Sequence, residues 1–531
     1  MKKPVSRTAP GLLAEMAALR PDHEFIVDGS ARFSYGSFQR SVCEYARGLY
    51  ALGLRRGGRL AILMDNRHEW LTAYFAAMRL GAEVVALSTW STGAELAYQL
   101  NHAEVEFLVA EENLRGRALI ADIGQAATDD IGCLAHVIVV DGPAEGGLIA
   151  FGDLPELGRS IADPAATADA ARPDDTACIL YTSGSTAAPK GVPLCHRGLI
   201  DNMWEIGERM HLLPSDRLWF AISMFWSFGC VNALFTTMTH GGTIVLQHRF
   251  EAGAALKLIE DERCTMFYGM ANMAQAMTEH PWRANFDLSS LRTGATIGAP
   301  AQIQRIVDLG VREICNVYGL TEAYGNSAVS DARAPLEQRL HSCGRPLNGV
   351  SIRIVDPESG MVLPAGNIGE IAVAGRVTPG YLNDPARTAA SLDGDGYLRT
   401  GDLGFLDAEG NLVYRGRLKE MVKTGGINVA PAEVEAVLMR HGAVEQVYVT
   451  GLADPKLDQA VAAVIVARPG HSLDPADLSA HCRRSLAGYK IPRHYRFVTA
   501  GDLPLTATGK LMKNRLGELF DPIGGPADGQ V

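Results

Sequence analysis

The sequence predicts an α/β protein with a large N-terminal domain and a small C-terminal α+β domain, on three observations. The chain has 531 residues and is 47% hydrophobic, which is more than one compact domain usually holds. Short apolar runs alternate with helical patterns over its first two thirds. The pattern then changes to short strands after Gly344, and to a compact mixed unit after Arg417.

The alternation begins with a βαβ unit. Arg59–Met64 has the apolar run of a buried strand, Arg67–Leu80 the spacing of an amphipathic helix, and Glu83–Leu87 that of the next strand. Further strands are expected at Phe107–Ala110, His136–Val140, Ala177–Leu180 and Thr243–Leu246. Strands that alternate with helices form mostly parallel sheets, so mostly parallel sheets are expected here.

Two later regions differ from this pattern. Residues 344–414 contain short strands separated by Gly, Asn and Pro, which predicts a small β-rich subdomain. The last region is predicted to contain helices at Pro431–Met439 and Pro475–Leu486 and strands at Val444–Gly451, Ala460–Val466 and Arg496–Val498. We therefore expect an N-terminal domain over residues 1–417 and a C-terminal domain over residues 418–531.

Composition excludes several classes of protein. The formal net charge of -11 argues against general nucleic-acid binding, which normally needs a basic face. The nine cysteines are dispersed, and no CxxC pair signals a zinc site or a disulfide framework. This pattern fits a reducing cytoplasm, and the first 20 residues lack the apolar core of a signal peptide.

Residues 218–247 contain no Asp, Glu, Lys or Arg, a stretch long enough to span a membrane. Several Ser, Thr and Asn residues interrupt it, and Arg217 and Arg249 flank it symmetrically, which gives no orientation signal. We therefore predict a buried helix followed by the strand Thr243–Gln247, forming core and the wall of a pocket.

The strongest local motif is YTSGSTAAPKGVPL, residues Tyr181–Leu194, directly after an apolar strand. A loop rich in Ser, Thr and Gly can turn several N–H groups and hydroxyls toward one anion, and Lys190 adds a positive charge. The spacing is not that of a Walker phosphate loop. Taken alone, the motif is also compatible with a flexible Ser/Gly linker.

This motif resembles the phosphate loop of the adenylate-forming superfamily, which includes acyl-CoA synthetases, peptide-synthetase adenylation domains and beetle luciferases. Four more segments match the family in its order: YGLTE from Tyr318, YLRTGD from Tyr397, GRLKE from Gly416 and PLTATGK from Pro504. The resemblance thus spans nearly the whole chain. It implies two mostly parallel sheets and a β-rich subdomain in the N-terminal domain, with a mobile C-terminal domain.

The resemblance also implies the sites for ATP and CoA. Tyr318 would stack on adenine opposite Gly298-Ala299-Pro300, and Asp402 would accept hydrogen bonds from the ribose, with Arg417 nearby. In the absence of its neighbours, Asp402 would be interpreted as a turn residue. The residues implied to bind ATP or CoA are Thr182, Ser183, Gly184, Ser185, Thr186, Lys190, Gly298, Ala299, Pro300, Tyr318, Gly319, Asp402, Arg417, Lys423, Gly425, Gly426 and Asn428.

Four residues are implied to act in catalysis: Lys510, Thr321, Glu322 and Lys419. Lys510 would bridge the attacking carboxylate and the α-phosphate, where two anions meet. Thr321 would donate to the α-phosphate, and Glu322 would bind the Mg²⁺ that ATP brings. Lys419 matches the family's hinge, which exchanges Lys510 for the Lys423–Gly426 face between the two half-reactions.

The chain departs from the family pattern twice. The phosphate loop has Ala187 where Gly is usual, and Trp226 stands where His is frequent. We expect Trp226, Phe228, Val231 and Tyr268 to shape the pocket for the acid, although all four are also compatible with an ordinary core.

The predicted function is activation of an apolar carboxylic acid by ATP, with pyrophosphate release and transfer of the acyl group to CoA. One alternative acceptor is the phosphopantetheine of a carrier protein. A weaker alternative is a non-catalytic adenylate-binding protein. The predicted partners are a small carboxylic acid and CoA or an acyl carrier protein, in the cytoplasm, with no nucleic acid and no integral membrane segment. The sequence leaves open whether the protein is a monomer or a homodimer.

Overall fold

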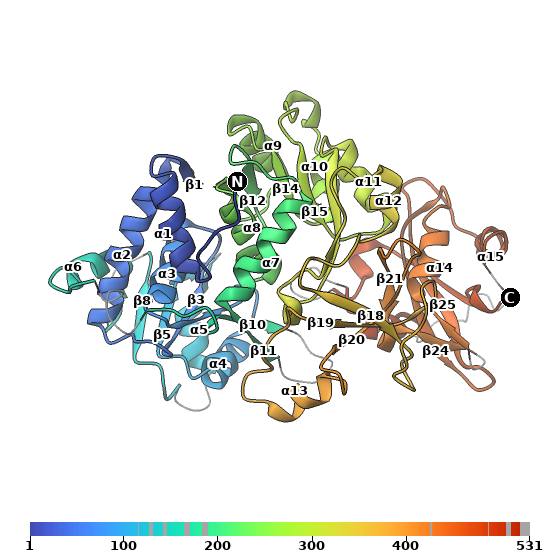
Figure 1. The fold of residues 1–531 in the computed structure, drawn as a ribbon. Coiled ribbons are helices and arrows are strands. Elements are labelled where there is room, and N and C mark those ends of the chain that lie inside the picture. Colours follow the sequence, from blue (N-terminus) through green and yellow to red (C-terminus); the bar gives the residue numbers. More distant parts are fainter. Residues whose placement is uncertain are drawn as a thin grey trace. The chain divides into compact units, whose positions relative to one another are not determined.

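The fold is described from a computed structural model of residues 1–114, 116–126, 131–141, 146–163, 170–182, 189–424, 427–486, 488–505 and 511–520 (Figure 1). The chain divides into two compact units. The first comprises Met1–Ile352, Val373–Leu398 and Gly410–Leu412, and the second comprises Arg353–Ala372, Arg399–Glu409 and the chain from Val413 onward. None of the described helices has the length and hydrophobicity required to cross a membrane.

The first unit contains a seven-stranded sheet built on the predicted βαβ unit. Its strands, in spatial order, are β11 (Lys190–Cys195), β10 (Thr176–Thr182), β4 (Glu83–Ala86), β3 (Arg59–Leu63), β5 (Phe107–Ala110), β8 (His136–Val139) and β9 (Ile149–Ala150). All neighbours are parallel except the antiparallel pair β10–β11. This confirms the predicted parallel sheet.

The second sheet of this unit has eight strands. In spatial order they are β17 (Ala328–Val329), β16 (Glu313–Tyr318), β15 (Thr293–Thr296), β14 (Met266–Tyr268), β12 (Arg217–Phe220), β13 (Thr243–Leu246), β1 (Glu24–Asp28) and β2 (Ala31–Ser34). The six strands from β16 to β1 run parallel, and antiparallel strands close both edges. Their carboxyl ends therefore meet at one edge of the sheet.

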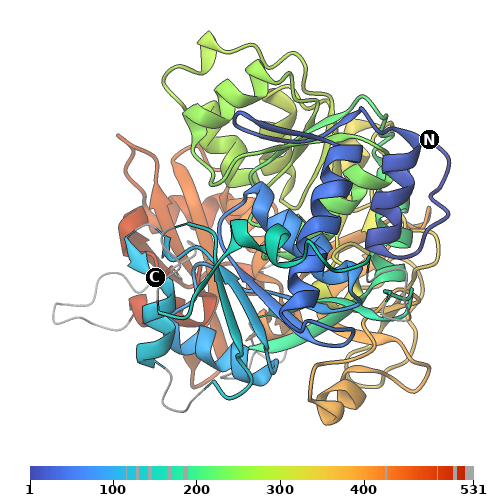
Figure 2. The ribbon, with the colours of Figure 1, turned by 90° about the vertical axis from the view of Figure 1, so that its left-hand side faces the viewer.

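The helices of the first unit lie mostly around the two large sheets (Figures 1 and 2). They are α1 (Ala9–Leu19), α2 (Tyr35–Ala51), α3 (His68–Arg79), α4 (Gly93–His102), α5 (Leu119–Ala126), α6 (Leu154–Leu157), α7 (His196–Arg209), α8 (Leu234–Thr239), α9 (Ala252–Asp261), α10 (Ala271–Thr278), α11 (Pro300–Asp308), α12 (Leu336–His341) and α13 (Pro385–Ser391). Local signals fix many of their starts: Ser34 caps α2 by accepting from Ser37 N, and Thr92 and Glu95 form a capping box on α4.

Helix α3 differs from the prediction, because every residue from Trp70 to Met78 is buried. The helix packs on α1 and α2, and its Phe75 and Tyr74 rings lie 5.9 and 6.4 Å from Phe235 of α8. A helix covered on all sides needs no polar face. The prediction of an amphipathic helix is therefore wrong, and α3 is buried on all sides.

Two further predictions need correction. The uncharged stretch from Leu218 begins with strand β12 rather than a helix. The predicted buried helix follows as a π-helical turn at Ser227–Ala233 and the short helix α8, and the predicted strand is β13. The last five residues of the YTSGSTAAPKGVPL motif, Lys190–Leu194, belong to strand β11, which pairs with β10 from Thr182↔Lys190 to Thr176↔Cys195. Val192 and Leu194 are buried, and the pairing of Lys190 with Thr182 holds Lys190 at the start of the strand.

A two-stranded sheet, β6 (Asn113–Leu114) and β7 (Arg117–Ala118), also lies in the first unit, and two further sheets lie toward the C-terminus. A four-stranded sheet has the order β18 (Ser351–Val355), β19 (Gly369–Ala374), β20 (Leu398–Leu406) and β21 (Leu412–Arg417). The last sheet contains β22 (Val422–Thr424), β23 (Ile427–Val429), β24 (Val444–Asp454), β25 (Asp458–Ala467) and β26 (His494–Val498), accompanied by α14 (Pro431–Leu438) and α15 (Pro475–Arg483). Val434, Val447 and Leu478 lie in the hydrophobic core of this part. The predicted β-rich region and α+β unit are both present.

Candidate active site

The candidate site begins at the carboxyl edge of the eight-stranded sheet. Strands β14, β15 and β16 are parallel neighbours, with Tyr268 opposite Ala295 and Thr296 opposite Asn316. Gly298-Ala299-Pro300 therefore follows β15 close to where Tyr318 ends β16. Ligands bind at this edge in open α/β sheets, because loops rather than side-chain layers fill it. Pro300 starts α11, where its missing N–H costs no hydrogen bond.

The loop after β16 contains a tight turn. A single 3₁₀ turn at Thr321–Ala323 is followed by Tyr324 in the left-handed region (φ 57°) and by Gly325 (φ 86°). A Cβ on Gly319 would lie 1.8 Å from the carbonyl oxygen of Gly325. Only glycine therefore fits at residue 319 in this geometry, and the turn fixes the backbone that carries Thr321 and Glu322.

Glu322 is the centre of a polar cluster. Its side-chain oxygen Oε1 accepts hydrogen bonds from Lys190 Nζ at 3.0 Å and from Tyr381 Oη at 3.0 Å. Lys190 Nζ also lies 2.9 Å from Tyr381 Oη. The cluster joins strand β11, the turn after β16 and the loop after β19, three segments far apart in the sequence.

The pKa values of Lys190 and Tyr381 are both raised in this cluster. Burial alone would lower the pKa of Lys190, but the Glu322 carboxylate and the Tyr381 hydroxyl outweigh it and raise this pKa above its ordinary value. Lys190 therefore carries a positive charge at neutral pH. For Tyr381, burial and the Glu322 carboxylate raise the pKa of the phenol, which keeps it a hydrogen-bond donor.

Sequence reasoning predicted Lys190 and Glu322 but missed Tyr381. Tyr381 stands in the segment TPGYLNDP, after the pair Pro379-Gly380, which indicates only a turn. Its proximity to Glu322 is created by tertiary structure, since Thr378 N donates to Glu322 O and Leu382 N donates to Gly191 O.

The uncharged segment after β12 lies against this turn. Ser227 Oγ is 3.2 Å from Thr321 Oγ1, and Asn232 Nδ2 donates to Tyr324 O at 2.9 Å. Both residues belong to the π-helical turn Ser227–Ala233, a distortion that is frequent at functional sites. The segment that the sequence assigned to the acid pocket is therefore joined to the turn assigned to the nucleotide.

The four predicted pocket residues occupy different environments. Phe228 and Tyr268 pack with ring centroids 4.6 Å apart, and Asn326 Nδ2 donates to Tyr268 Oη at 3.0 Å. Val231 is completely buried. Trp226 is instead 38% exposed and meets Trp90 edge-to-face with centroids 4.9 Å apart. Trp226 is therefore the one of the four that a ligand could reach without rearrangement of the core.

The sequence comparison identifies the family. The profile of the AMP-binding enzyme family matches residues 13–382, and that of the AMP-binding enzyme C-terminal domain matches residues 433–510. The chain belongs to the AMP-binding enzyme family. Both sheets of the first unit lie within the larger match, and most of the α+β region lies within the smaller one.

Relatives and solved structures cover almost the whole chain. A Mycobacterium tuberculosis protein named 3-[(3aS,4S,7aS)-7a-methyl-1,5-dioxo-octahydro-1H-inden-4-yl]propanoyl:CoA ligase is 35% identical over 97% of this chain and 99% of its own length. ATP-bound MatB from Rhodopseudomonas palustris is 28% identical, with a TM-score of 0.84 over 97% of this chain and 99% of that one. The anthranilate CoA ligase AuaEII in complex with anthranoyl-AMP is 27% identical, with a TM-score of 0.83 over 98% of both chains.

Among the predicted residues of this AMP-binding enzyme that lie in the second unit, the structure describes the side chains of Asp402, Arg417, Lys419 and Lys423. Asp402 lies on β20, is 4% exposed, and forms an ion pair with Arg417 Nε at 3.1 Å. Asp402 is therefore a strand residue rather than a turn residue, and the structure brings it together with Arg417. Lys419 lies in a 3₁₀ turn, Leu418–Glu420, and Lys423 lies on β22.

Several predicted residues lie outside the described part of the chain. They are Ser183, Gly184, Ser185, Thr186, Gly425, Gly426 and Lys510, together with Ala187 and the side chain of Asn428. Thr182, the last residue of β10, is described. Its hydroxyl is buried and has no hydrogen-bond partner among the described residues, as expected for a group that a ligand would satisfy.

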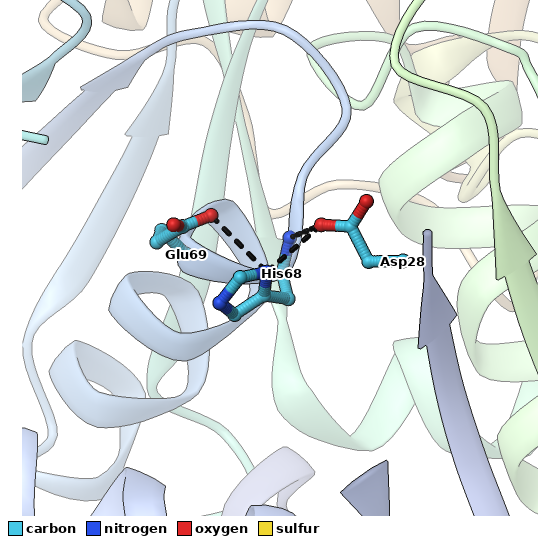
Figure 3. Close-up of side chains that lie close together, drawn as sticks. All are labelled: Asp28, His68 and Glu69. Carbon is cyan, nitrogen blue, oxygen red and sulfur yellow. Dashed lines mark hydrogen bonds and ion pairs between the residues drawn. The ribbon is translucent and has the colours of Figure 1, made fainter. Parts of the chain in front are cut away.

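One further cluster of the first unit has a possible metal-ligand composition: Asp28, His68 and Glu69 (Figure 3). Its carboxylates are already engaged. Asp28 accepts from His68 Nδ1 at 2.8 Å and from His248 Nε2 at 2.6 Å, and Glu69 is held by both Nε and Nη2 of Arg67. A cation would have to displace a fixed guanidinium charge, so we interpret this cluster as a structural ion-pair network.

Proposed function

We propose that this protein activates an apolar carboxylic acid with ATP and transfers the acyl group to CoA, as an AMP-forming acid–thiol ligase. In the first step a carboxylate oxygen attacks the α-phosphorus, and the bond to pyrophosphate breaks. In the second step the thiol attacks the acyl carbonyl and AMP leaves. The observation that carries the proposal is the contact between Ser227 and Thr321 at 3.2 Å, which brings an acid-pocket segment to the nucleotide turn.

We assign each predicted residue to one part of the substrates. Lys190 supplies a fixed positive charge and Thr321 a hydroxyl, both suited to phosphate oxygens. Lys510 is assigned to the reacting carboxylate and α-phosphate by its place in the family motif. Tyr318 and Gly298-Ala299-Pro300 are assigned to adenine, and Asp402 with Arg417 to the ribose. Lys423, Gly425, Gly426 and Asn428 are assigned to the thiol-transfer state.

Glu322 fits the Mg²⁺ that accompanies ATP. Mg²⁺ usually takes one or two carboxylates, substrate phosphates and waters. Glu322 is 7% exposed, and its Oε2 makes no hydrogen bond to any residue that the structure describes, whereas Oε1 is occupied by Lys190 and Tyr381. Bound there, the ion would neutralise phosphate charge.

The character of the acid follows from the pocket segment. No Asp, Glu, Lys or Arg lies between Arg217 and Arg249, and burying an unpaired ammonium would cost several kcal/mol, about 3 or more. Phe225, Phe228 and Tyr268 are at most 9% exposed. We infer an acid with an uncharged alkyl or ring-containing body, a class that includes the ring-bearing acid named for the Mycobacterium tuberculosis relative.

The acceptor and the domain boundary are part of the same proposal. CoA is the acceptor named for that relative and for AuaEII, and a carrier-protein phosphopantetheine is the alternative that offers the same thiol. The boundary between the adenylating domain and the smaller domain is placed between Arg417 and Leu418. The family matches, which end at residue 382 and resume at 433, support a boundary in this interval.

A pyrophosphate-release screen tests the proposal. Fatty and aryl acids, together with the twenty amino acids, are supplied with ATP and Mg²⁺, with and without CoA, and thioesters are measured in parallel. We expect apolar acids to be preferred and CoA thioesters to accumulate. A clear preference for a free α-amino acid would refute the pocket assignment, and adenylation without any CoA thioester would favour the carrier-protein alternative.

Trp226→Ala extends this test to the pocket. If Trp226 forms part of the wall, the variant should shift the preferred acid toward bulkier members. Trp282→Ala is a matched control, since Trp282 is also exposed (65%) but belongs to the segment after α10. If neither variant changes the order in which acids are preferred, Trp226 contributes only to packing.

A further inference from the structure

Asn66 lies in the short connection between β3 and α3, outside every motif described above. It is 2% exposed. Its side-chain Nδ2 donates to Ile222 O at 3.0 Å and to Gln247 O at 3.3 Å, and its Oδ1 accepts from Met224 N at 2.9 Å. Three of the four hydrogen bonds that an asparagine amide can make are thus directed at the backbone of two segments that follow β12 and β13.

The connection that carries Asn66 is itself firmly anchored. Asp28, which ends β1, accepts from His68 N at 3.0 Å and from His68 Nδ1 at 2.8 Å (Figure 3). The other oxygen of Asp28 accepts from His248 Nε2, and His248 O accepts from Asn66 N at 3.2 Å. Asp65 N donates to Glu111 Oε2 at 2.7 Å. These bonds fix the backbone of Asn66 and of its neighbours Asp65 and His68, so the position of the Asn66 side chain is also fixed.

The segment tethered by Asn66 leads directly into the proposed acid pocket. Ile222 and Met224 precede Phe225 and Trp226, and Trp226 N donates to Ser223 O at 3.1 Å. The next tether along the chain is Ser227, whose hydroxyl contacts Thr321 at 3.2 Å. Phe225 and Trp226 therefore stand between two polar anchors, one on the seven-stranded sheet and one on the nucleotide turn.

The surroundings make the Asn66 tether hard to replace. A Cβ on Gly229 would lie 2.5 Å from Ser223 O, so the backbone at Ser223 is closely packed against Gly229. If the amide were removed, Ile222 O and Met224 N would be left buried without these partners. Buried backbone groups without partners are strongly disfavoured, and the segment would move to satisfy them.

We propose that Asn66 is a positioning residue that sets the acid selectivity of this enzyme by fixing the backbone at Ile222–Met224. The inference rests on the proposed function, in which the segment that contains Phe225, Trp226 and Phe228 forms the acid pocket and Trp226 is its most exposed side chain. Asn66 is buried, and its side chain would act through the backbone groups to which it is bonded. Its removal should change which acids are accepted and leave the nucleotide site, centred on Lys190, Glu322 and Tyr381, as it is.

The test compares Asn66→Ala and Asn66→Asp with the wild-type enzyme. Asn66→Asp keeps the shape of the side chain but replaces the NH₂ donor by an oxygen acceptor. This oxygen would face the carbonyl oxygens of Ile222 and Gln247, to which Nδ2 now donates. We expect kcat/KM for the preferred acid to fall about tenfold or more in both variants, corresponding to the loss of roughly one to two hydrogen bonds. The ratio of kcat/KM between the preferred acid and the next larger homologue should fall about fivefold or more, while KM for ATP stays within about twofold.

Tyr35→Phe is the control for a merely structural effect. Tyr35 is fully buried, and its hydroxyl donates to Gly242 O at 2.8 Å, just before β13. This variant removes one buried hydrogen bond to the same sheet without touching Ile222–Met224. It should lower the melting temperature and leave the acid ranking unchanged.

Two outcomes would overturn the inference. One is an acid ranking that is identical in wild-type, Asn66→Ala and Asn66→Asp enzymes. The other is a parallel loss for ATP and for every acid, which would indicate general destabilisation. If Asn66→Ala does not fold, the ranking of Asn66→Asp decides. A wild-type enzyme that releases no pyrophosphate with apolar acids would instead contradict the proposed function, so the two failures are distinguishable.

Discussion

At the scale of single residues, two charged groups of the proposed nucleotide site share one hydroxyl. Tyr381 Oη lies 3.0 Å from Glu322 Oε1 and 2.9 Å from Lys190 Nζ, and the Lys190 ammonium is 4.3 Å from the Tyr381 ring centroid. The phenol thus holds a cation and an anion in one arrangement before ATP binds. Pre-arranged charges avoid reorganisation during reaction, which is the main electrostatic contribution that enzymes make.

Removing this hydroxyl should weaken the use of ATP. Hydrogen bonds to charged groups contribute about 1.5–3 kcal/mol each, so Tyr381→Phe should lower kcat/KM for ATP about tenfold or more. The KM for the acid should change less, because Tyr381 is bonded to Lys190 and Glu322 and not to the pocket segment. Initial rates at varied ATP and at varied acid provide the measurement.

The control for this variant is Tyr495→Phe, which removes a tyrosine hydroxyl that lies 3.0 Å from Ser479 Oγ in the second unit. Its kinetics should match those of the wild type. If Tyr381→Phe also matches the wild type, the hydroxyl contributes nothing to ATP use and the cluster is held by Lys190 and Glu322 alone.

At the scale of elements, the turn after β16 decides where Thr321 and Glu322 stand. Gly319 approaches Gly325 so closely that a methyl group would lie 1.8 Å from its carbonyl oxygen. Gly319→Ala must push the two sides of the turn apart. Overpacking of this kind costs about 1–3 kcal/mol, and the displacement falls on the nucleotide turn.

We therefore expect Gly319→Ala to lower the melting temperature and to reduce kcat/KM for ATP at least about tenfold. Gly394→Ala is the matched control, because a Cβ at Gly394 would meet no atom within 4 Å. Thermal unfolding and pyrophosphate release report the two effects separately. Retained activity in Gly319→Ala would show that the turn tolerates expansion and does not position Glu322.

At the scale of the whole molecule, the family membership implies two half-reactions that use different residues. Lys510→Ala should reduce acid-dependent pyrophosphate release by about two or more orders of magnitude, and it should largely spare thioester formation from a supplied acyl adenylate. Lys419→Pro fixes φ at the hinge, and it should reduce thioester formation more than adenylation. The two half-reactions, measured separately, give opposite patterns for the two variants.

Each assignment can fail in its own way. Equal loss of both half-reactions in Lys510→Ala would indicate a shared or structural role for that lysine. Unchanged steady-state thioester synthesis in Lys419→Pro would remove Lys419 from the hinge. A proline that freezes the thiol-transfer state would reverse the pattern for Lys419 and still support the hinge.

The sequence by itself determined the fold class and the family. Apolar runs such as Phe107–Ala110 and Thr243–Leu246 became strands with the predicted bounds, because a fully buried strand needs a continuous apolar run. The ordered motifs around Lys190, Tyr318 and Asp402 led to the AMP-binding enzymes, to which the chain belongs. Local patterns carry this information because backbone geometry and turn chemistry are local.

Tertiary structure alone decided the rest. The amphipathic interpretation of α3 was wrong because helices on several sides bury it, and the loop interpretation of Lys190–Leu194 was wrong because β10 pairs with it. Tyr381 lies 59 residues from Glu322, and Asn66 lies 156 residues from Ile222. Neither contact leaves a pattern in the sequence. A hydrogen bond between distant segments depends on how the sheets pack, and the residues next to it in the sequence do not reveal it.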